Sequence, residues 1–392
     1  MSRNADWIII VEYSNSVFGD VMKLVPWDIF NKLVKEHRTD ELFRTFSTKH
    51  QFAALLYGQL SGTKSLRDLE LCMDSQKARI ERAGAVVPRR STLADADQFR
   101  SPNVFVGVFK HMLGMVERST RRLMYDAIRL IDSTSLRLSG AGSEWARFSA
   151  EVCGAKAHFV FDPDLGCPTY HMVTAAKVND IVAAKEMPID AGATYVFDLG
   201  YYDFGWWSKL DDANCRIVTR FRKNTPLKIV KSTKVEPGTC IVSDKIGFLP
   251  ARQGNIRKNP FRSAVREIVI RMDNGGKLRV LTNDLDASAQ EIADLYKRRW
   301  LIELFFRVMK QNFKIVHLLG RSPNAIRIQI AIALISFLLM RMVCKKSPAP
   351  QTLLETVRLV RANLMQRRDL TTLKHHKPSS LVDSSQISLN SA

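Results

Sequence analysis

The hydrophobic pattern of this chain changes its period near residue 126, and this change restricts the folds that the chain can adopt. Before it, apolar residues recur every three or four positions, as in the segment WDIFNKLVKE, which predicts helices. After it, strands are predicted for DAIRLIDSTSLRL, KAHFVFDPDLGCPTYHMVTAA, ATYVFDLGYYD and CRIVTRFRK, and short helices for VNDIVAAKEM and YDFGWWSKLDDAN. This order predicts a mixed α/β sheet with helices on its faces, preceded by a small all-helical region.

The same patterns divide the 392 residues into six parts. Ser288 can cap a long helix that reaches about Phe313, and further helices are predicted to residue 364. Strand-like runs separated by Pro, Gly and Asn predict a β-rich insertion before Ser288. We therefore expect a loose leader (1–20), a helical domain (21–120), the first part of the α/β core (121–223), the insertion (224–287), the rest of the core with C-terminal helices (288–365) and a serine-rich, disordered tail (366–392).

The chain carries a large excess of positive charge. Its 59 Lys and Arg outnumber its 39 Asp and Glu, which gives a formal net charge of +20. An excess of this size favours a polyanionic partner, and nucleic acid is the usual one. An anionic membrane is the alternative, but it requires a polybasic segment beside an amphipathic anchor. Because the basic residues are spread along most of the chain, we predict nucleic acid as the partner and no membrane association.

The apolar runs of this sequence are too short to predict export or membrane insertion. The N-terminal segment contains only a three-residue isoleucine run, too short for a signal-peptide core. The longest apolar run, Ile330–Met340, has eleven residues and predicts a buried core helix, since a bilayer requires about 20. The six cysteines form no CxxC pair and no zinc-like spacing with histidine, which predicts a reducing, cytoplasmic compartment.

Two aspartates follow buried-strand patterns in the predicted core. Asp132 ends the apolar part of the first strand, and Asp198 follows the run TYVF in a later one. Carboxylates at the carboxyl ends of neighbouring strands can converge in the crevice there. Each aspartate alone also matches an ordinary turn cap, so a functional interpretation requires a third group.

The predicted helix that begins at Ser288 supplies a third carboxylate. At 100° per residue, Tyr296, Arg299, Glu303 and Lys310 lie within an arc of about 60° on one face. The adjoining face is apolar and can pack on the sheet, which would turn Glu303 toward the strand ends. A surface helix with Arg299 and Glu303 as an i,i+4 ion pair is the alternative interpretation.

Three carboxylates from two strands and a helix suit Mg²⁺ or Mn²⁺, which prefer oxygen ligands. Two such ions about 4 Å apart can activate a nucleophile and stabilise the leaving oxygen of a phosphodiester. Arg299 and Lys310 would then hold a DNA phosphate beside the ions. The chain has no Gly-rich phosphate loop and no Gly-x-Ser-x-Gly motif, so we predict no nucleotide cofactor and no serine nucleophile.

These residues resemble a known set of motifs. The four helix residues just described fit the spacing Y-x2-R-x3-E-x6-K, which is similar to the YREK signature of insertion-sequence transposases of family four, in the DDE class. Asp198-Leu-Gly-Tyr resembles that family's second-aspartate block, Asp132-Ser-Thr its first, and HLLGRSPNAIRIQIAIALI the segment after its glutamate. The likeness extends from about residue 20 to 365, and a β-rich insertion precedes the glutamate, as in the family.

The resemblance implies a ribonuclease H-like catalytic core with Asp132, Asp198 and Glu303 as catalytic residues and ligands of two Mg²⁺ or Mn²⁺ ions. It implies contacts to the DNA backbone from three helix residues, Tyr296, Arg299 and Lys310. The helical domain would bind DNA. The implied function is cut-and-paste transposition of an insertion sequence at terminal inverted repeats, by phosphodiester hydrolysis and strand transfer. A homodimer would pair double-stranded transposon ends with target DNA, at the nucleoid in a bacterial cytoplasm.

Two other functions are compatible with the same residues. A decayed or repurposed copy would bind DNA without cutting it, and the intact triad argues against that function. A metal-dependent DNA nuclease on the same core would cut without strand transfer and without specific ends. Inverted repeats flanking the reading frame would favour a transposase over such a nuclease.

For several side chains near the motifs, we either leave two roles open or expect a structural role. Trp300 follows the motif arginine and is either a core residue or a stacking platform for an unpaired base. The resemblance implies a Trp in the insertion that would hold a flipped base at the hairpin step. This insertion contains no Trp, so the candidates for that role are Phe248 and Phe261. We expect core or surface histidines, rather than ligands, at His158 and His171. We also expect structural roles, such as the turn around Pro163, for the nearby aspartates Asp126, Asp162, Asp164 and Asp203.

Overall fold

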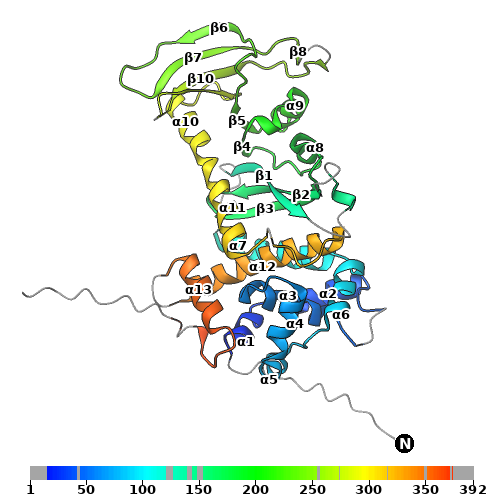
Figure 1. Ribbon diagram of the computed structural model, residues 1–392. Helices are drawn as coiled ribbons and strands as arrows, with labels where there is room; N and C mark the ends of the chain where they lie inside the picture. Colours follow the sequence, from blue (N-terminus) through cyan, green and yellow to red (C-terminus); the bar gives the residue numbers. More distant parts are fainter. Residues whose placement is uncertain are drawn as a thin grey trace, which may run out of the picture.

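The computed structural model describes residues 16–370 and residue 373, apart from gaps at 42–44, 121–126, 139–143, 148–152, 254–256, 273, 316 and 348–350. A body of helices occupies one end of the molecule and a large sheet extends from it (Figure 1). A column of two consecutive helices, α10 (Ala289–Arg298) and α11 (Trp300–Asn312), runs from the outer strands of the sheet down to the helical body.

Nine strands form one mixed sheet in the order β3-β2-β1-β4-β5-β11-β10-β7-β6. In its first five strands, β1, β4 and β5 are parallel, β2 is antiparallel to β1, and β3 is antiparallel to β2. This order and these directions are those of a ribonuclease H-like sheet, so the predicted fold class is confirmed. The five strands are β1 (Ile128–Leu138), β2 (Cys153–Asp162), β3 (Cys167–Ala175), β4 (Thr194–Phe197) and β5 (Arg216–Arg220).

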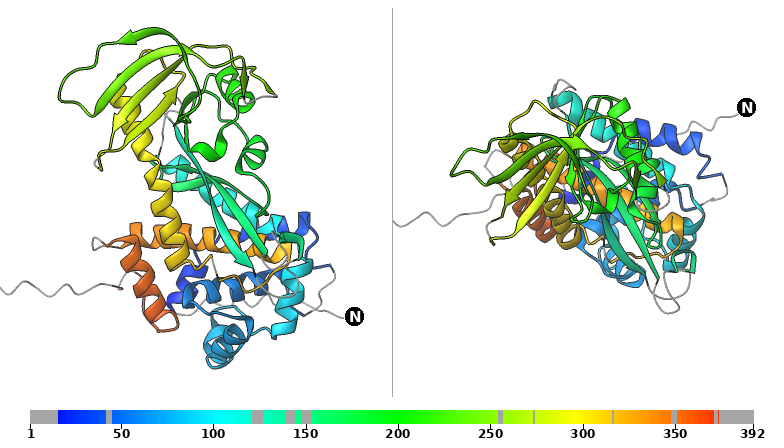
Figure 2. Two further views of the ribbon diagram at one scale, coloured as in Figure 1. Left: turned by 45° about the horizontal axis from the view of Figure 1, so that its top comes forward. Right: turned by 90° about the horizontal axis from the view of Figure 1, so that it is seen from above.

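The predicted β-rich insertion continues the same sheet. β11 pairs antiparallel with β5, and β10, β7 and β6 follow outward. Figure 2 shows these strands at the end of the molecule opposite the helical body. The described residues between 224 and 287 contain no helix, as predicted. The insertion strands are β6 (Lys228–Thr233), β7 (Ile241–Phe248), β8 (Arg252–Gln253), β9 (Arg257–Lys258), β10 (Val265–Arg271) and β11 (Lys277–Thr282).

The helical body combines the N-terminal helices with two helices from the end of the chain. α12 (Pro323–Lys346) contacts α3, α6, α7 and α13, so the C-terminal helices pack with the N-terminal ones. The predicted helical character of the N-terminal region is confirmed. The remaining helices of this body are α1 (Val17–Met22), α2 (Trp27–Glu36), α3 (Thr48–Ser61), α4 (Leu66–Asp74), α5 (Lys77–Arg82), α6 (Arg90–Phe99), α7 (Asn103–Thr120) and α13 (Leu353–Asn363).

α12 is the buried core helix that the sequence predicts, but it is 24 residues long and extends beyond the eleven-residue apolar run. By length and composition alone it could cross a membrane, yet 83% of its most apolar window is buried inside the protein. Its N-terminal part is longer than predicted because Ile326 and Ile328, which precede the run, also pack inside. We therefore assign α12 to the core of the helical body.

Both faces of the core part of the sheet, from β3 to β5, are covered by helices. On one face α11 lies between the sheet and α12, since the Phe305 ring is 5.5 Å from Phe159 of β2 and 5.6 Å from Phe337 of α12. On the other face lie α8 (Asp180–Lys185) and α9 (Phe204–Asp212), where the Trp206 ring is 4.9 Å from that of Phe197. Because side chains alternate along a strand, each strand contributes to both cores.

The predicted helix from Ser288 to Phe313 is interrupted. Ser288 caps α10 as predicted, and its hydroxyl accepts a hydrogen bond from the Glu291 amide at 3.1 Å. At Arg299 the chain leaves the regular pattern: its amide bonds the carbonyl of Tyr296, three residues back, at 3.1 Å. Such a tightened turn is one way in which consecutive helices join. The interruption lies within the four-residue motif, which the periodicity predicts to lie on one regular helix.

The predictions for the leader (1–20) and the tail (366–392) are wrong at some of the residues that the structure describes. Residues 16–20 of the predicted leader are not loose, because they lead into α1, in which Val17 and Phe18 are fully buried. In the predicted tail, Leu373 is buried, and its carbonyl accepts a hydrogen bond from the Gln351 side chain at 2.7 Å. The rest of the predicted disordered tail, from residue 374, lies outside the described residues.

Candidate active site

The parallel pairing of β1 with β4 brings the two predicted aspartates together. Leu130 of β1 lies opposite Val196 of β4. If this register is continued by two residues in both strands, Asp132 lies opposite Asp198. Leu130 and Val196 both belong to the core on the α11 side. Since side chains alternate between faces, both aspartates point toward that side as well.

Asp132 is not at the end of its strand, contrary to the prediction. β1 continues to Leu138, and Asp132 lies opposite Phe159 of β2 within the ladder. The apolar run ends at Asp132 because the following residues alternate between buried and exposed positions, while the strand itself continues. Asp198 does follow the end of its strand, and its Oδ1 accepts a hydrogen bond from the Gly200 amide at 2.8 Å.

α11 supplies the third carboxylate at the predicted position. Arg299 Nη2 donates to Glu303 Oε1 at 2.5 Å, which is the i,i+4 pair that the alternative interpretation required. The same guanidinium also reaches the sheet, where Nη1 donates to Asp132 Oδ2 at 3.3 Å. The side chains of Arg299 and Asp132 are only 19% and 20% exposed, so this is not an ordinary surface pair. Arg299 therefore links the helix carboxylate to the strand carboxylate.

The electrostatics of Asp132 show that the three acids are close neighbours. Burial raises the pKa of the Asp132 carboxyl to about 6, and the negative charges of Asp198 and Glu303 add to the rise. A hydrogen bond from the Ser133 amide and the positive charge of Arg299 oppose it. Because the charges of Asp198 and Glu303 raise the proton affinity of Asp132, this carboxylate favours a nearby positive charge, which Arg299 supplies here.

The donor set fits a hard divalent cation. The three carboxylates come from β1, the end of β4 and α11, and oxygen ligands of this kind are those that Mg²⁺ and Mn²⁺ prefer. In the described part of the chain, no three acidic, imidazole or thiol groups stand close enough to hold an ion with their side chains as they lie. Arg299 lies between Asp132 and Glu303 instead, so an ion and this guanidinium would compete for the same oxygens.

The other motif residues differ in exposure. Tyr296 is buried beside Arg299, and burial raises the pKa of its hydroxyl. Lys310 is exposed in the last turn of α11, about 10 Å beyond Glu303 along the helix axis. Trp300 is 50% exposed, so the interpretation as a core residue is wrong. Of the two insertion aromatics, Phe261 is buried in the core and Phe248 is 40% exposed.

Of the two histidines near the motifs, His158 is a core residue, as expected, and His171 is half-buried. His158 is fully buried and its Nε2 lies 2.8 Å from the Thr174 hydroxyl. Burial lowers the pKa of both His158 and His171 to about 4, which keeps both neutral at neutral pH. His171 packs edge-on against Phe109 of α7.

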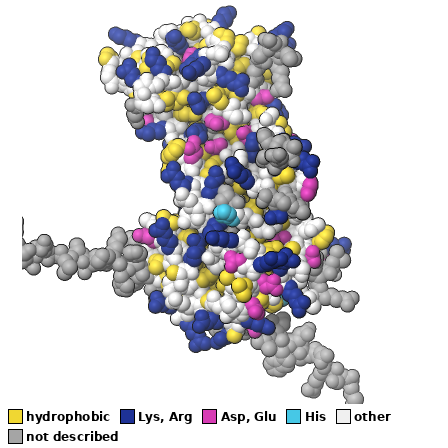
Figure 3. All heavy atoms as spheres, in the orientation of Figure 1, with side chains coloured by type: hydrophobic (Ala, Val, Ile, Leu, Met, Phe, Trp, Pro, Cys, Tyr) yellow, Lys and Arg dark blue, Asp and Glu magenta, His cyan; other side chains and the backbone are white. Residues whose placement is uncertain are grey.

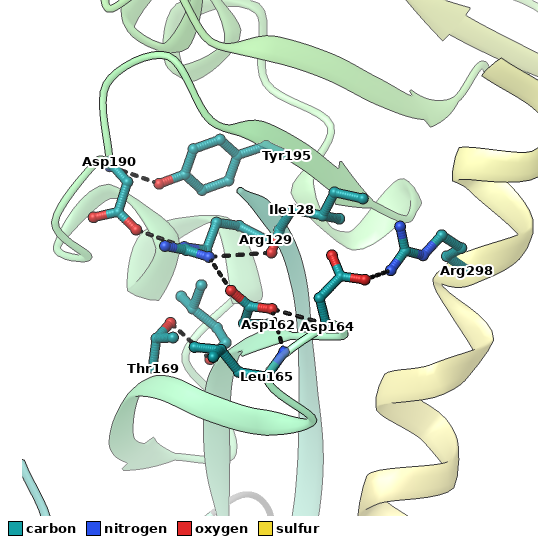
Figure 4. A network of polar contacts seen from close by, with 10 residues as sticks. Ile128, Arg129, Asp162, Asp164, Leu165, Thr169, Asp190, Tyr195 and Arg298 are labelled. Atoms are coloured by element: carbon teal, nitrogen blue, oxygen red, sulfur yellow. Dashed lines mark hydrogen bonds and ion pairs between the residues drawn. The ribbon is translucent and has the colours of Figure 1, made fainter. Parts of the chain in front are cut away.

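The neighbouring aspartates have structural roles, as expected. Asp162 accepts hydrogen bonds within its own turn and pairs with Arg129 at 2.7 Å, and Arg129 also binds Asp190 (Figure 4). Asp164 pairs with Arg298 of α10. Asp203 caps α9 by accepting from the Trp206 amide at 2.8 Å. The remaining aspartate of that set, Asp126, lies outside the described residues.

One acidic residue beside the triad was not predicted. Asp180, at the start of α8, bonds the hydroxyl of Ser133, the residue that follows Asp132. In the sequence it lies 48 residues from Asp132 and 18 from Asp198, in a short helix, DIVAAK, with no distinguishing pattern. Only the packing of α8 on the sheet brings it to the site, so no local signal could have identified it.

Comparisons with known proteins agree with this geometry. The family described as "Transposase DDE domain" matches residues 126–339, and the family described as "Domain of unknown function (DUF4372)" matches residues 13–86. A Sinorhizobium fredii protein whose name describes it as a transposase, y4zB, is 35% identical over 295 residues, which cover 74% of this chain and 82% of that protein. A Geobacillus stearothermophilus protein named as the probable transposase for insertion sequence element IS5377 is 28% identical over 242 residues, 60% of this chain and 63% of that protein.

Among solved structures, the chain is similar to the piggyBac transposase in its synaptic complex with hairpin DNA. The sequence identity is 13% and the TM-score 0.49, over 97% of this chain and 90% of that one.

The ribonuclease H-like sheet and the acidic side chains gathered on it are typical of a class of enzymes, those that process phosphodiesters. Within it, the family match covers more than half of the chain, which therefore belongs to the transposases with a DDE domain. The protein is an insertion-sequence transposase, an enzyme that cuts DNA and transfers strands. As a member of that family it binds DNA and depends on divalent metal ions.

Proposed function

We propose that this transposase moves its insertion sequence by cut-and-paste transposition, with Asp132, Asp198 and Glu303 as its catalytic and metal-binding triad. The observation that carries the proposal is the convergence of these carboxylates on one face of the sheet, where Arg299 bonds two of them. The YREK spacing on α10 and α11 supports assignment to insertion-sequence family four.

Two Mg²⁺ or Mn²⁺ ions held by the triad would stabilise charge on both the attacking and the leaving oxygen of a phosphodiester. The side chains around the triad bind and orient the DNA. The Arg299 guanidinium exchanges its carboxylate partners for a phosphate, for which its planar fork is suited. The exposed Lys310 takes a second phosphate further along the strand, while the buried Tyr296 ring packs beside Arg299 and limits its movement.

The reaction is a series of phosphodiester exchanges. Water breaks the bond from phosphorus to the 3′ oxygen at the transposon end, which leaves a 3′-OH and a 5′-phosphate. The 3′-OH then attacks the opposite strand, so that one P–O bond forms as another breaks and a hairpin end results. A second water opens the hairpin, and the same exchange joins the freed 3′-OH to target DNA. Trp300, half exposed at the first turn of α11, offers a surface on which an unpaired base can stack.

Other parts of the chain serve DNA binding in this proposal. The helical N-terminal region binds double-stranded DNA at the transposon ends, and the basic insertion contacts the DNA backbone. Two copies form a homodimer when two ends are paired, because each end needs its own triad. The protein acts at the nucleoid in a bacterial cytoplasm.

The proposal is tested with Asp132→Asn, Asp198→Asn and Glu303→Gln in the full chain. Each variant is incubated with DNA that carries both ends of the element and Mg²⁺, and double-strand release is measured. We expect losses of about 10³-fold, since metal ions contribute several kcal/mol to transition-state stabilisation and each 1.4 kcal/mol is tenfold. Binding to the same DNA in a gel-shift assay should be unchanged. Asp190→Asn, which removes a carboxylate on the far side of the core, is the matched control.

Cleavage at the wild-type rate in any of the three variants would remove that residue from the triad. The wild-type protein separates the remaining alternatives. Nicking of any DNA without strand transfer would identify a nuclease on the same core. Binding to the ends without any nicking would identify a DNA-binding protein that has lost catalysis.

A further inference from the structure

Asp180 lies behind the triad and bonds the strand that carries Asp132. Its Oδ1 accepts hydrogen bonds from the Ser133 hydroxyl at 2.9 Å and from Lys156 Nζ at 3.1 Å. Ser133 directly follows Asp132, and its amide donates to Asp132 Oδ1 at 2.7 Å. Asp132 faces α11, whereas Ser133, its neighbour along the strand, faces α8. Asp180 therefore approaches from the opposite face and constrains the residue next to the proposed ligand.

The second oxygen of Asp180 faces the turn that carries Asp198. α8 packs against this turn, Leu199–Tyr201, in which the Gly200 amide bonds Asp198 Oδ1. A β-carbon added to Gly200 would lie 3.0 Å from Asp198 Oδ1 and 3.3 Å from Asp180 Oδ2. The two carboxylates therefore flank the same α-carbon with no space for a side chain between them. One acidic side chain contacts the backbone regions of both strand ligands.

Tyr201 is a buried residue of the turn that carries Asp198. Its hydroxyl lies beside Ser133 without a hydrogen bond of ordinary geometry to any described residue. Burial raises the pKa of this hydroxyl well above its usual value, and the charges of Asp132, Asp180 and Asp198 raise it further. The phenol keeps its proton and is an unused donor among three carboxylates.

On the α8 side of the sheet, the positive charge next to Asp180 comes from Lys156. Lys156 is its ion-pair partner, and the Lys156 ammonium also donates to the Val178 carbonyl at 3.3 Å. His158 Nδ1 lies 3.6 Å from Asp180 Oδ1, but burial keeps this histidine neutral. Lys156 therefore balances the charge of Asp180, and the charge of the triad is left for Arg299 or a metal ion.

We propose that Asp180 is a positioning residue of the transposition reaction, which holds Asp132 and Asp198 at the spacing that divalent ions require. It acts through Ser133 on one side and through the turn at Gly200 on the other. This inference rests on the proposed function, because it needs the triad to be the metal site. Residues that orient metal ligands in this way typically contribute 10–100-fold to metal affinity.

The test is a titration of the full chain with Mn²⁺, in which free Mn²⁺ is followed by electron paramagnetic resonance. We expect Asp180→Ala to weaken Mn²⁺ binding by roughly 10–100-fold. Asp180→Asn keeps an acceptor oxygen for Ser133 and should lose less. Asp190→Ala is the matched control, since Asp190 also sits in an ion pair beside the same sheet but bonds Arg129, away from the triad. It should bind Mn²⁺ as the wild type does, and all variants should show cooperative thermal unfolding.

Wild-type Mn²⁺ affinity in Asp180→Ala would overturn the proposal. Equal losses in Asp180→Ala and Asp190→Ala would also overturn it, because a general disturbance of the sheet would then explain both. Asp132→Asn in the same titration reports on the proposed function separately. If that variant keeps full affinity, the metal site lies elsewhere, which rejects the triad and with it the role of Asp180.

Discussion

The two halves of the nine-stranded sheet differ in how their charged side chains are buried and paired. The core half, from β3 to β5, contains enclosed ion pairs, such as Arg129 with Asp162 and Arg299 with Asp132. In the outer half, residues 222–282 contain fourteen Lys and Arg but only four Asp and Glu. Two of those acids are buried in ion pairs, Asp244 with Arg266 and Glu267 with Arg279. Every residue of the outermost strand, β6, is exposed.

This difference separates two kinds of recognition on one continuous sheet. The core half fixes a few carboxylates in a small, partly buried space, which suits a small cation. The outer half spreads cations over a wide exposed surface, shown in dark blue at the top of Figure 3, which suits a phosphate backbone. The ladder from β5 to β11 joins the halves, so DNA held on the outer strands lies on the same rigid element as the triad.

The largest expected difference between the halves is in stability. Phe305 of α11 packs on both Phe159 and Phe337, so Phe305→Ala should lower the free energy of unfolding by about 3–5 kcal/mol. Phe248 at the end of β7 is 40% exposed, and Phe248→Ala should change it by about 0.5 kcal/mol or less. Urea denaturation followed by circular dichroism measures both. Equal effects would show that the outer strands are packed as tightly as the core.

An effect of intermediate size concerns the pH dependence of the core half. The pKa of Asp132 is raised to about 6, so ionising this side chain costs stability in the metal-free protein. That cost is absent below the unfolded-state pKa near 3.8, grows as the pH rises from there to about 6, and stays constant above it. Asp132→Asn should therefore raise the free energy of unfolding at neutral pH by about 2 kcal/mol and leave it unchanged near pH 3.5. Denaturation without metal at the two pH values tests this, and a stabilisation independent of pH would contradict it.

The smallest expected effect concerns DNA binding by the outer half. In the described residues, no ion pair involves the exposed side chains of Lys228, Lys231 or Lys234. Replacing all three by Ala should weaken binding to any DNA sequence and reduce the slope of log K against log salt by about 0.9 for each phosphate that these lysines neutralise. Filter binding over a salt series measures the slope. Lys185→Ala, which removes a lysine of α8 that is paired with Asp203, should leave it unchanged. An unchanged slope in the triple variant would separate the outer strands from the DNA.

Much of the core half could be predicted from local patterns. Buried runs of residues with turns between them indicated the strands, and the parallel register then followed from packing that the fold class implies. Glu303 was predictable because helical periodicity places it beside Arg299. The tightened turn at Arg299 was not, since no Pro or Gly marks it in the sequence. The strand predicted for DAIRLIDSTSLRL does extend past Asp132, but that aspartate was placed at a strand end because the second half of β1 alternates in burial and lacks an apolar run.

Contacts between distant segments account for the rest. Asp180 reaches the site only because α8 folds back over β1 and the turn after β4. Arg299 bonds Asp132 across 167 residues of sequence, a link that periodicity in either element cannot specify. In the outer half the excess of cations was visible in the composition. Which of them face solvent depended on the buried pairs of Arg266 and Arg279 with acids on neighbouring strands.

The central claim is that Asp132, Asp198 and Glu303 form one metal site, which replaces the present contacts of Asp132 and Glu303 with Arg299. Crystals of the full chain bound to terminal DNA and Mn²⁺ test it most directly, through anomalous scattering from the metal. The account predicts anomalous peaks within bonding distance of all three carboxylates, about 2.0–2.2 Å for an ion of this type, with Arg299 turned to a DNA phosphate. Peaks at other side chains, or Arg299 still bonded to Asp132 and Glu303 in the DNA complex, would contradict it.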